Sequence, residues 1–169
     1  MRSWRATSAV LLGLLVLGGG SKLDRLTPVE RDHFDGLRVW MDKKQEKAFL
    51  KNKTEEERNQ WLKDAGLWER WYKFDEGMRD QILGGEVATG WPYDAVYMAW
   101  GKPHERKKMI GRSASRSELL TYRFEVMEDG AVLVWAPGSK ATYKAVGKYT
   151  MLVYIDDDKV GELERRDGW

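Results

Sequence analysis

The sequence predicts an α+β protein in which amino-terminal helices are followed by a small three- or four-stranded antiparallel sheet packed against helices. Between residues 27 and 83, apolar residues recur at intervals of three and four, the period of an amphipathic helix. From residue 120 onwards, apolar and polar residues alternate, as in half-buried strands. Helices that precede antiparallel strands usually cover one face of a single sheet.

Two helix starts are marked by capping boxes. Thr27-Pro28-Val29-Glu30 places a hydroxyl at the N-cap, proline at the first helical position and glutamate three residues later. Thr54-Glu55-Glu56-Glu57 repeats the pattern. Gly66, followed by Leu67, predicts the left-handed C-cap of the second helix. A further apolar stripe continues to Leu83, where Gly84 and Gly85 end the helical region.

A short helix is predicted within residues 90–103. Pro92 suits its first turn, Val96 and Trp100 share one face, and Gly101 with Pro103 ends it. We expect Gly101 to adopt the left-handed cap conformation. The polar and basic residues from Lys107 to Ser117 predict a loop.

Four segments carry a strand signature. Residues 120–126 and 149–155 alternate clearly, 160–165 return after the turn Asp156-Asp157-Asp158, and 131–135 follow the turn Asp129-Gly130. The loop Ala136-Pro137-Gly138-Ser139 joins the two halves of the sheet, and its conformation is left open.

The amino terminus has the three parts of a secretory signal peptide. Arg2 and Arg5 precede an apolar run at residues 9–17, which Gly18-Gly19-Gly20-Ser21 closes. The run is shorter than the roughly 20 apolar residues of a membrane-spanning helix. The alternatives, a buried helix or a short anchor, would be ended by three consecutive glycines. We therefore predict a lipoprotein-like signal segment at 1–21, a helical region at 22–85 and an α+β domain at 86–169.

The end of this segment resembles a bacterial lipoprotein signal, in which a leucine and two small residues precede a lipidated cysteine. Leu17-Gly18-Gly19 fits the first three places, but Gly20 stands where the cysteine belongs. The chain as written has no sulfur to carry lipid there, so either the mature protein is soluble after cleavage or this position has been altered.

The second half of the chain combines a short helix bounded by Gly90 and Gly101 with late antiparallel strands, and in this it resembles the SmpA/OmlA (BamE-like) domain of outer-membrane lipoproteins. Gly90, Val96, Gly101 and Pro103 occupy the places of that family's G-x-x-x-x-x-V-x-x-x-x-G-x-P segment. A strand with aromatic residues and a final hairpin at residues 149–165 follow, as in the family. The resemblance covers residues 86–165, and the helical region before it is longer than the family's usual amino-terminal arm.

This resemblance implies an exported accessory protein that binds other envelope proteins, as in outer-membrane protein assembly, located in the periplasm or outer membrane. A related fold also serves secreted inhibitors of β-lactamases. The alternative function is therefore a secreted binding or enzyme-inhibitor module. The identity of the partner, the oligomeric state and the role of residues 27–83 stay open.

Residues that carry chemistry are sparse. The chain has no cysteine and two histidines, His33 and His104, neither within a set of spaced metal ligands. No nucleophile elbow or phosphate-binding loop is present. Asp156-Asp157-Asp158 lacks the spacing of a calcium loop and predicts a solvated hairpin turn. We expect no enzymatic activity, no metal and no cofactor.

Charged residues make up 33% of the chain, but the formal net charge is only +2. This balance argues against a nucleic-acid partner, which requires a clustered basic face. The basic segment Arg106-Lys107-Lys108, with Arg112 and Arg116, could contact an anionic membrane surface or an acidic partner. The alternative interpretation is that these basic residues lie in a solvated loop with no partner.

Nine tryptophans are the most unusual part of the composition. Most lie on apolar stripes and are expected in the core. Trp91, at the start of the short helix with Tyr93, and Trp135, at the end of a strand, are candidate interface anchors, because an aromatic side chain buries a large area at low entropic cost. Packing at the edge of the core explains them equally well.

Overall fold

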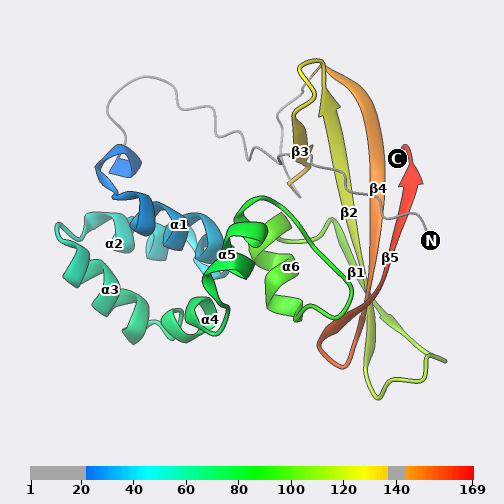
Figure 1. Cartoon of the computed structure of the whole chain (residues 1–169), viewed down its shortest axis with the longest axis horizontal. Helices are drawn as coiled ribbons and strands as arrows, with labels where there is room; N and C mark the ends of the chain where they lie inside the picture. The colour runs from blue at the N-terminus through cyan, green and yellow to red at the C-terminus, as the bar shows by residue number, and fades with distance from the viewer. Residues whose placement is uncertain (1–21, 137–143) are drawn as a thin grey trace.

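The protein has two layers, a set of short helices and one antiparallel sheet, which confirms the predicted α+β class (Figure 1). The computed structural model describes residues 22–136 and 144–169. The predicted signal segment 1–21 lies outside the described residues, as does the Pro137–Ser139 part of the loop. No helix in the described ranges is long and apolar enough to cross a bilayer.

The helical layer is built from short elements joined by tight turns. They are η1 (Lys22–Arg25), α1 (Pro28–Leu37), η2 (Arg38–Trp40), α2 (Lys43–Lys51), α3 (Glu55–Asp64), α4 (Trp68–Tyr72) and α5 (Glu76–Leu83), followed by α6 (Tyr93–Trp100), which lies between the other helices and the sheet.

The helix boundaries follow the predicted caps. The Thr27 hydroxyl accepts a hydrogen bond from the Glu30 backbone, and the Glu30 carboxylate accepts one from the Thr27 backbone. Thr54 and Glu57 repeat this at α3. Gly66 has φ +66°, and Leu67 N–H donates to Leu62 O at 2.9 Å, which completes a Schellman C-cap.

The sheet has the order β1-β2-β4-β5, with β3 also paired to β2. Its two long strands, β2 (Ser117–Met127) and β4 (Ala145–Asp156), pair along their whole length. On the other side of β2, β1 (Glu105–Met109) covers the first half and β3 (Val132–Val134) the second half. β5 (Lys159–Asp167) returns along β4 and forms the opposite edge of the sheet, where its first residues also pair with the segment around Pro92.

The sheet therefore has five strands, where the sequence predicted three or four. The additional strand is β1, part of which falls in the basic stretch that was predicted as a loop. Four of its five residues are exposed. Because an edge strand of this kind buries neither face, it lacks the apolar alternation by which a strand is recognised in a sequence.

Gly101 ends α6 with φ 75° and ψ −154°. The positive φ agrees with the expected need for glycine, but the ψ value does not belong to the predicted left-handed cap. This extended conformation is one that essentially only glycine adopts. It carries the chain from the end of α6 into the approach to β1, and the Gly101 carbonyl accepts a hydrogen bond from the Tyr122 hydroxyl at 2.9 Å.

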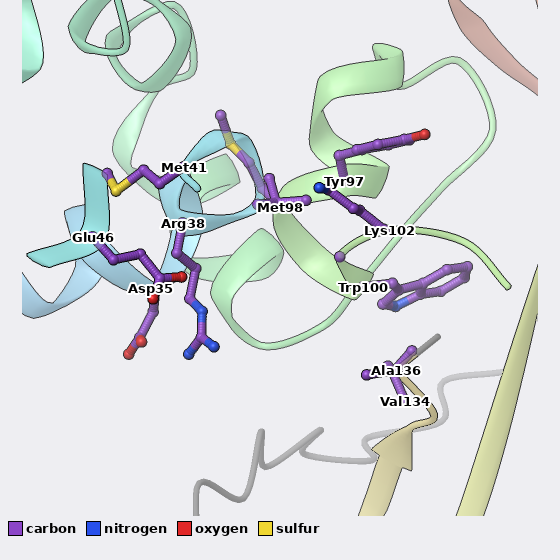
Figure 2. Close-up of a pocket in the computed structure, with 12 residues that line it drawn as sticks. Asp35, Arg38, Met41, Glu46, Tyr97, Met98, Trp100, Lys102, Val134 and Ala136 are labelled. Atoms are coloured by element: carbon purple, nitrogen blue, oxygen red, sulfur yellow. The ribbon is translucent and has the colours of Figure 1, made fainter. Parts of the chain in front are cut away.

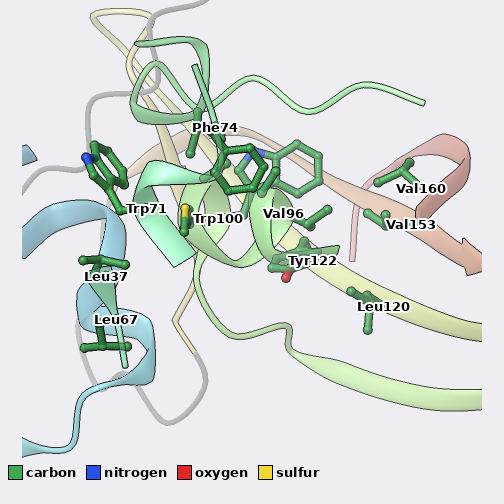
Figure 3. Close-up of a cluster of buried hydrophobic side chains, with 14 of the residues drawn as sticks. Leu37, Leu67, Trp71, Phe74, Val96, Trp100, Leu120, Tyr122, Val153 and Val160 are labelled. Carbon is green, nitrogen blue, oxygen red and sulfur yellow. The ribbon is translucent and has the colours of Figure 1, made fainter. Parts of the chain in front are cut away.

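The buried apolar side chains of the helices and of the sheet form one continuous cluster (Figure 3). Leu37 and Trp71 come from the helical region, Val96 and Trp100 from α6, and Tyr122 from the sheet. The Trp100 indole also donates to Gly85 O at 2.8 Å. α6 therefore joins the predicted regions 22–85 and 86–169 through a shared core.

Two buried polar groups lie in α1. Glu30 forms a salt bridge with Arg58 at 2.5 Å, and hydrogen bonds from Arg58 and Thr27 outweigh the effect of burial, so the pKa of Glu30 is lowered. His33 is 1% exposed, and its Nε2 lies 2.8 Å from the Tyr72 hydroxyl. Burial, with repulsion from Arg79, lowers the pKa of His33 to about 4.

Candidate functional site

A groove of about 350 Å³ opens where the helical layer meets the end of β3 (Figure 2). One wall comes from the end of α1, η2 and the start of α2, the other from the last turn of α6 and Lys102. Val134 and Ala136 close it from the sheet side. Its lining residues are Asp35, Arg38, Val39, Met41, Glu46, Tyr97, Met98, Trp100, Gly101, Lys102, Val134 and Ala136.

The walls of the groove are held by contacts outside it. The hydrogen bond to Gly85 orients the Trp100 ring. Trp40 stacks on Tyr97 with ring centroids 6.5 Å apart, and the Arg70 guanidinium lies 5.0 Å from the Trp40 ring. The groove is therefore preformed by residues that are packed on their far side.

Apolar atoms dominate the lining, and two methionines, Met41 and Met98, are part of it. Methionine is unbranched and polarisable, so it adapts to apolar groups of different shape. The volume falls within the range of about 300–1,000 Å³ that is usual for ligand pockets.

Charged side chains surround this apolar lining. Asp35 pairs with Arg31 at 2.8 Å, and the Arg38 guanidinium lies over the Phe34 ring at 5.7 Å. Within the described chain, neither Arg38, Lys102 nor Glu46 forms a salt bridge. The groove thus combines an apolar interior with charges that are available to a ligand.

The lining includes no serine, threonine or histidine, and Tyr97 supplies its one side-chain hydroxyl. The described lining residues therefore include no serine, threonine or cysteine nucleophile. Apolar interior and charged rim together are the arrangement of a binding surface.

Trp91 and Tyr93, two of the predicted anchors, lie together beside the β4–β5 hairpin. The backbone carbonyl of Trp91 accepts a hydrogen bond from Val160 N–H at 2.8 Å, and Tyr93 N–H donates one to the Asp158 carbonyl at 2.8 Å. Both side chains are half-buried. The Tyr93 ring packs on Tyr97 at 4.6 Å, and burial with the neighbouring Tyr97 hydroxyl raises the pKa of Tyr93.

Trp135 lies elsewhere. Its backbone N–H donates to Arg123 O at 2.8 Å, which continues the pairing of β3, and its ring contacts His104 at 5.2 Å and Trp169 at 5.9 Å. Val160, next to Trp91, pairs with Ile155 of β4, and Ile155 pairs with Glu118 of β2. Trp91 therefore lies level with Glu118 along the sheet. From Glu118 to Arg123 a strand rises by about 17 Å. The structure therefore does not bring the three predicted anchors together.

Arg106, Lys107 and Lys108 belong to β1 and not to a loop. Arg106 forms two hydrogen bonds of 2.7 Å with Glu118, and these lower the pKa of that carboxyl group. The register places Arg106 and Lys108 on the face of Leu120 and Glu118, and Lys107 on the opposite face. The three side chains do not form one basic surface.

The Asp156–Asp158 turn is present as predicted, but its carboxylates are not merely solvated. Asp156 binds Arg112 at 2.8 Å and Ser117 at 2.6 Å, and these hydrogen bonds lower its pKa. The Asp157 carboxylate accepts hydrogen bonds from the backbone N–H groups of Ser115 and Arg116. Arg116 also pairs with Asp158. Two of the basic residues thus hold the β1–β2 and β4–β5 hairpins together.

The two histidines occupy separate environments. His33 is enclosed by Trp68, Trp71 and Tyr72, with ring centroids 5.5–5.8 Å away, and His104 lies against Trp135. Among the residues that the structure describes, no three His, Asp or Glu side chains are arranged to hold a metal ion.

Sequence reasoning missed the groove because its walls come from segments about 100 residues apart, from Asp35 to Ala136. The available signal was indirect: Met41, Met98 and Val134 each continue an apolar pattern and are indistinguishable from core residues in the sequence. Comparison with known proteins adds no further constraint: no family model, curated protein or solved structure matches the chain.

Proposed function

We propose that this chain is an exported, non-enzymatic envelope protein that binds a segment of another envelope protein in the groove between its helical layer and its sheet. The observation that carries this proposal is the preformed groove, with an apolar interior and with Arg38 and Lys102 free of salt bridges in the described chain. The signal-like amino terminus and the resemblance of residues 86–165 to the SmpA/OmlA domain support the location.

The groove suits an apolar anchor side chain from the partner, seated against Met41 and Met98, next to an acidic residue that pairs with Arg38 or Lys102. Anchors of this kind carry most of the binding energy at protein interfaces, while the surrounding polar rim excludes water. The adaptable methionines also allow more than one anchor side chain to fit.

Site-specific photocrosslinking in cells of the native host tests this function. A photoreactive lysine analogue replaces Lys102 at the rim, and Lys159, exposed at the β4–β5 hairpin, provides the control position. We expect Lys102 to capture a defined envelope protein that Lys159 does not capture. Mass spectrometry of the recovered chain should find an amino terminus trimmed near residue 21.

A matched pair of substitutions tests the groove itself. Val39→Asp places a carboxylate in the apolar lining and should weaken capture through Lys102 about tenfold, since it opposes an apolar anchor and competes with the partner's acidic residue for Arg38 and Lys102. Val146→Asp makes the same change at a residue that is 68% exposed on β4, and capture should persist. Equal capture by both variants, or an untrimmed chain in the cytosol, would overturn the proposal.

A further inference from the structure

We infer that a second cavity, at the end of the helical layer farthest from the sheet, binds the phosphate group of an anionic ligand. The cavity has a volume of about 290 Å³ and is lined by residues of η1, the end of α2 and the start of α3. Figure 1 shows these elements on the side of the helical layer away from the sheet. The cavity shares no residue with the groove, and the inference does not depend on the proposed function.

The lining of this cavity is strongly basic. Five of its seven residues are cationic, and the remaining two are Leu50 and Asn52; no carboxylate is included. The cationic residues are Lys22, Arg25, Lys51, Lys53 and Arg58. A set of lysines and arginines without acidic residues contrasts with the chain as a whole, where the two signs nearly cancel.

Most of this charge is not neutralised by the described residues. Arg58 is bound by Glu30, and its Nη1 donates to Asn52 O. The other four cations form no salt bridge in that part of the chain. The Glu57 carboxylate accepts hydrogen bonds from the backbone N–H groups of Lys53 and Thr54, which cap α3. These hydrogen bonds, together with the nearby charges of Lys53 and Arg58, lower the pKa of Glu57.

Local helix electrostatics explain only part of the cluster. Lys51 lies in the last turn of α2, where the helix dipole favours a cation. Lys53 immediately precedes the N-cap of α3, where the dipole disfavours one. Lys22 and Arg25 come from the short η1 helix. Like charges brought together from three elements repel one another, so their convergence is best balanced by a bound anion.

The chemistry of the cavity points to phosphate. Several cations around one cavity suit a group with multiple charged oxygens, which lysines bind as point charges and an arginine binds through its planar fork. Arg58 is buried, with 6% of the residue exposed, and its guanidinium is held in place by Glu30. The Asn52 side-chain nitrogen, buried without a hydrogen-bond partner in the described structure, is an unused donor in the same wall.

Calorimetric titration of the full chain with pyrophosphate, at low salt, tests the inference for a soluble ligand. Co-sedimentation with phosphatidylcholine vesicles, with and without phosphatidic acid, tests the same phosphate group on a lipid. The test variant is Lys51→Ala/Lys53→Ala, and the control is Lys43→Ala/Lys44→Ala, which removes the same charge from the start of α2, outside the cavity. All four side chains are exposed, so the fold should persist in both variants.

We expect the test variant to bind at least about tenfold more weakly, while the control stays within about twofold of the unsubstituted chain. The side-chain amide resonance of Asn52 should shift on saturation. Binding of pyrophosphate identifies a soluble phosphate compound as the ligand type, and binding of phosphatidic acid vesicles alone identifies a lipid. No binding to either probe, or equal weakening by the two double substitutions, would overturn the inference.

Discussion

At the scale of single residues, the polar groups buried within α1 are held in one charge state each. Glu30 is kept ionised by Arg58 and by the capping box, whereas His33 is kept neutral by its aromatic surroundings and by Arg79. His33 Nδ1 has no hydrogen-bond partner in the described structure. The neutral imidazole is therefore tolerated in the core, and the imidazolium ion is not.

This difference predicts that the protein loses stability as the pH falls from about 6.5 to about 4. The imidazole of the unfolded chain takes up a proton near its ordinary pKa of 6.5, while folded His33 does so only near 4. Protons therefore favour the unfolded state within that window, and the loss amounts to about 2–3 kcal/mol. Urea unfolding measured at intervals between pH 7.5 and 4 checks it.

His33→Gln supplies the control, because glutamine keeps a polar side chain of moderate size without titrating in this range. The variant should start from a lower stability at pH 7 and show a flatter dependence below pH 6.5. Carboxyl groups near His33, including Asp32 with its raised pKa, are common to both proteins. If the two pH profiles were parallel, His33 would not be the source of the loss.

At the scale of elements, the two hairpins at one end of the sheet are joined through side chains. The Asp156–Asp158 turn of the β4–β5 hairpin binds Arg112, Ser115 and Arg116 in the β1–β2 connection. Asp157 and Asp158 adopt positive φ angles of 47° and 65°, which aspartate tolerates better than most residues. The clamp thus fixes the β1–β2 connection against the sheet.

Asp157→Ala should release this connection locally. The substitution removes the acceptor of the Ser115 and Arg116 N–H groups, so their amide hydrogen exchange should accelerate about tenfold or more, while the β2–β4 ladder keeps its protection. Hydrogen exchange followed by NMR measures each amide separately. Asp129→Ala makes the same change in another turn, where the carboxylate accepts a hydrogen bond from the Ala131 backbone, and should leave Ser115 and Arg116 unaffected. Unchanged exchange at both amides in Asp157→Ala would contradict the clamp.

Local signals predicted the elements whose stabilising contacts are local. Thr27, Thr54 and Gly66 act within one helical turn, and the structure confirms all three. β1 has no such signal, since its position depends on pairing with β2, and its residues face solvent on both sides. Gly101 lies between these cases: the need for a positive φ was predictable, but its ψ angle is set by the path to the sheet.

At the scale of the whole molecule, the helices and the sheet share one core and should unfold together. Leu37→Ala, at a residue that is 0% exposed in α1, should lower the free energy of unfolding by about 2–5 kcal/mol. NMR signals of Leu62 in the helical layer and Val153 in the sheet should disappear at one common urea concentration, shifted downwards in the variant.

Val29→Ala, at a residue that is 52% exposed in the same helix, is the matched control and should change stability by less than about 0.5 kcal/mol. Two separate transitions, with Val153 unaffected by the loss of Leu37, would show instead that residues 22–85 fold independently of the sheet.

The candidate sites depend on this long-range organisation, which explains why no motif marks them. Trp91 and Trp135 were singled out by their places in the sequence, yet the register separates them along β2. The two cavities gather residues of ordinary type, such as Met98 or Lys51, whose meaning depends on neighbours that are distant in the chain. Composition revealed the balance of charge but not its concentration in one cavity.

The pairing of β2 with β4 also has a consequence for the order of folding. Ser117 pairs with Asp156, 39 positions further along the chain, so this end of the central pair can form only after all of β4 has been made. The helical layer also depends on distant contacts, because Glu30 binds Arg58 28 positions away and His33 lies against Tyr72 39 positions away. During synthesis from the amino terminus, the helical layer must keep its apolar side exposed until β4 has emerged. The core that the helices share with the sheet is therefore complete only when nearly the whole chain has been made.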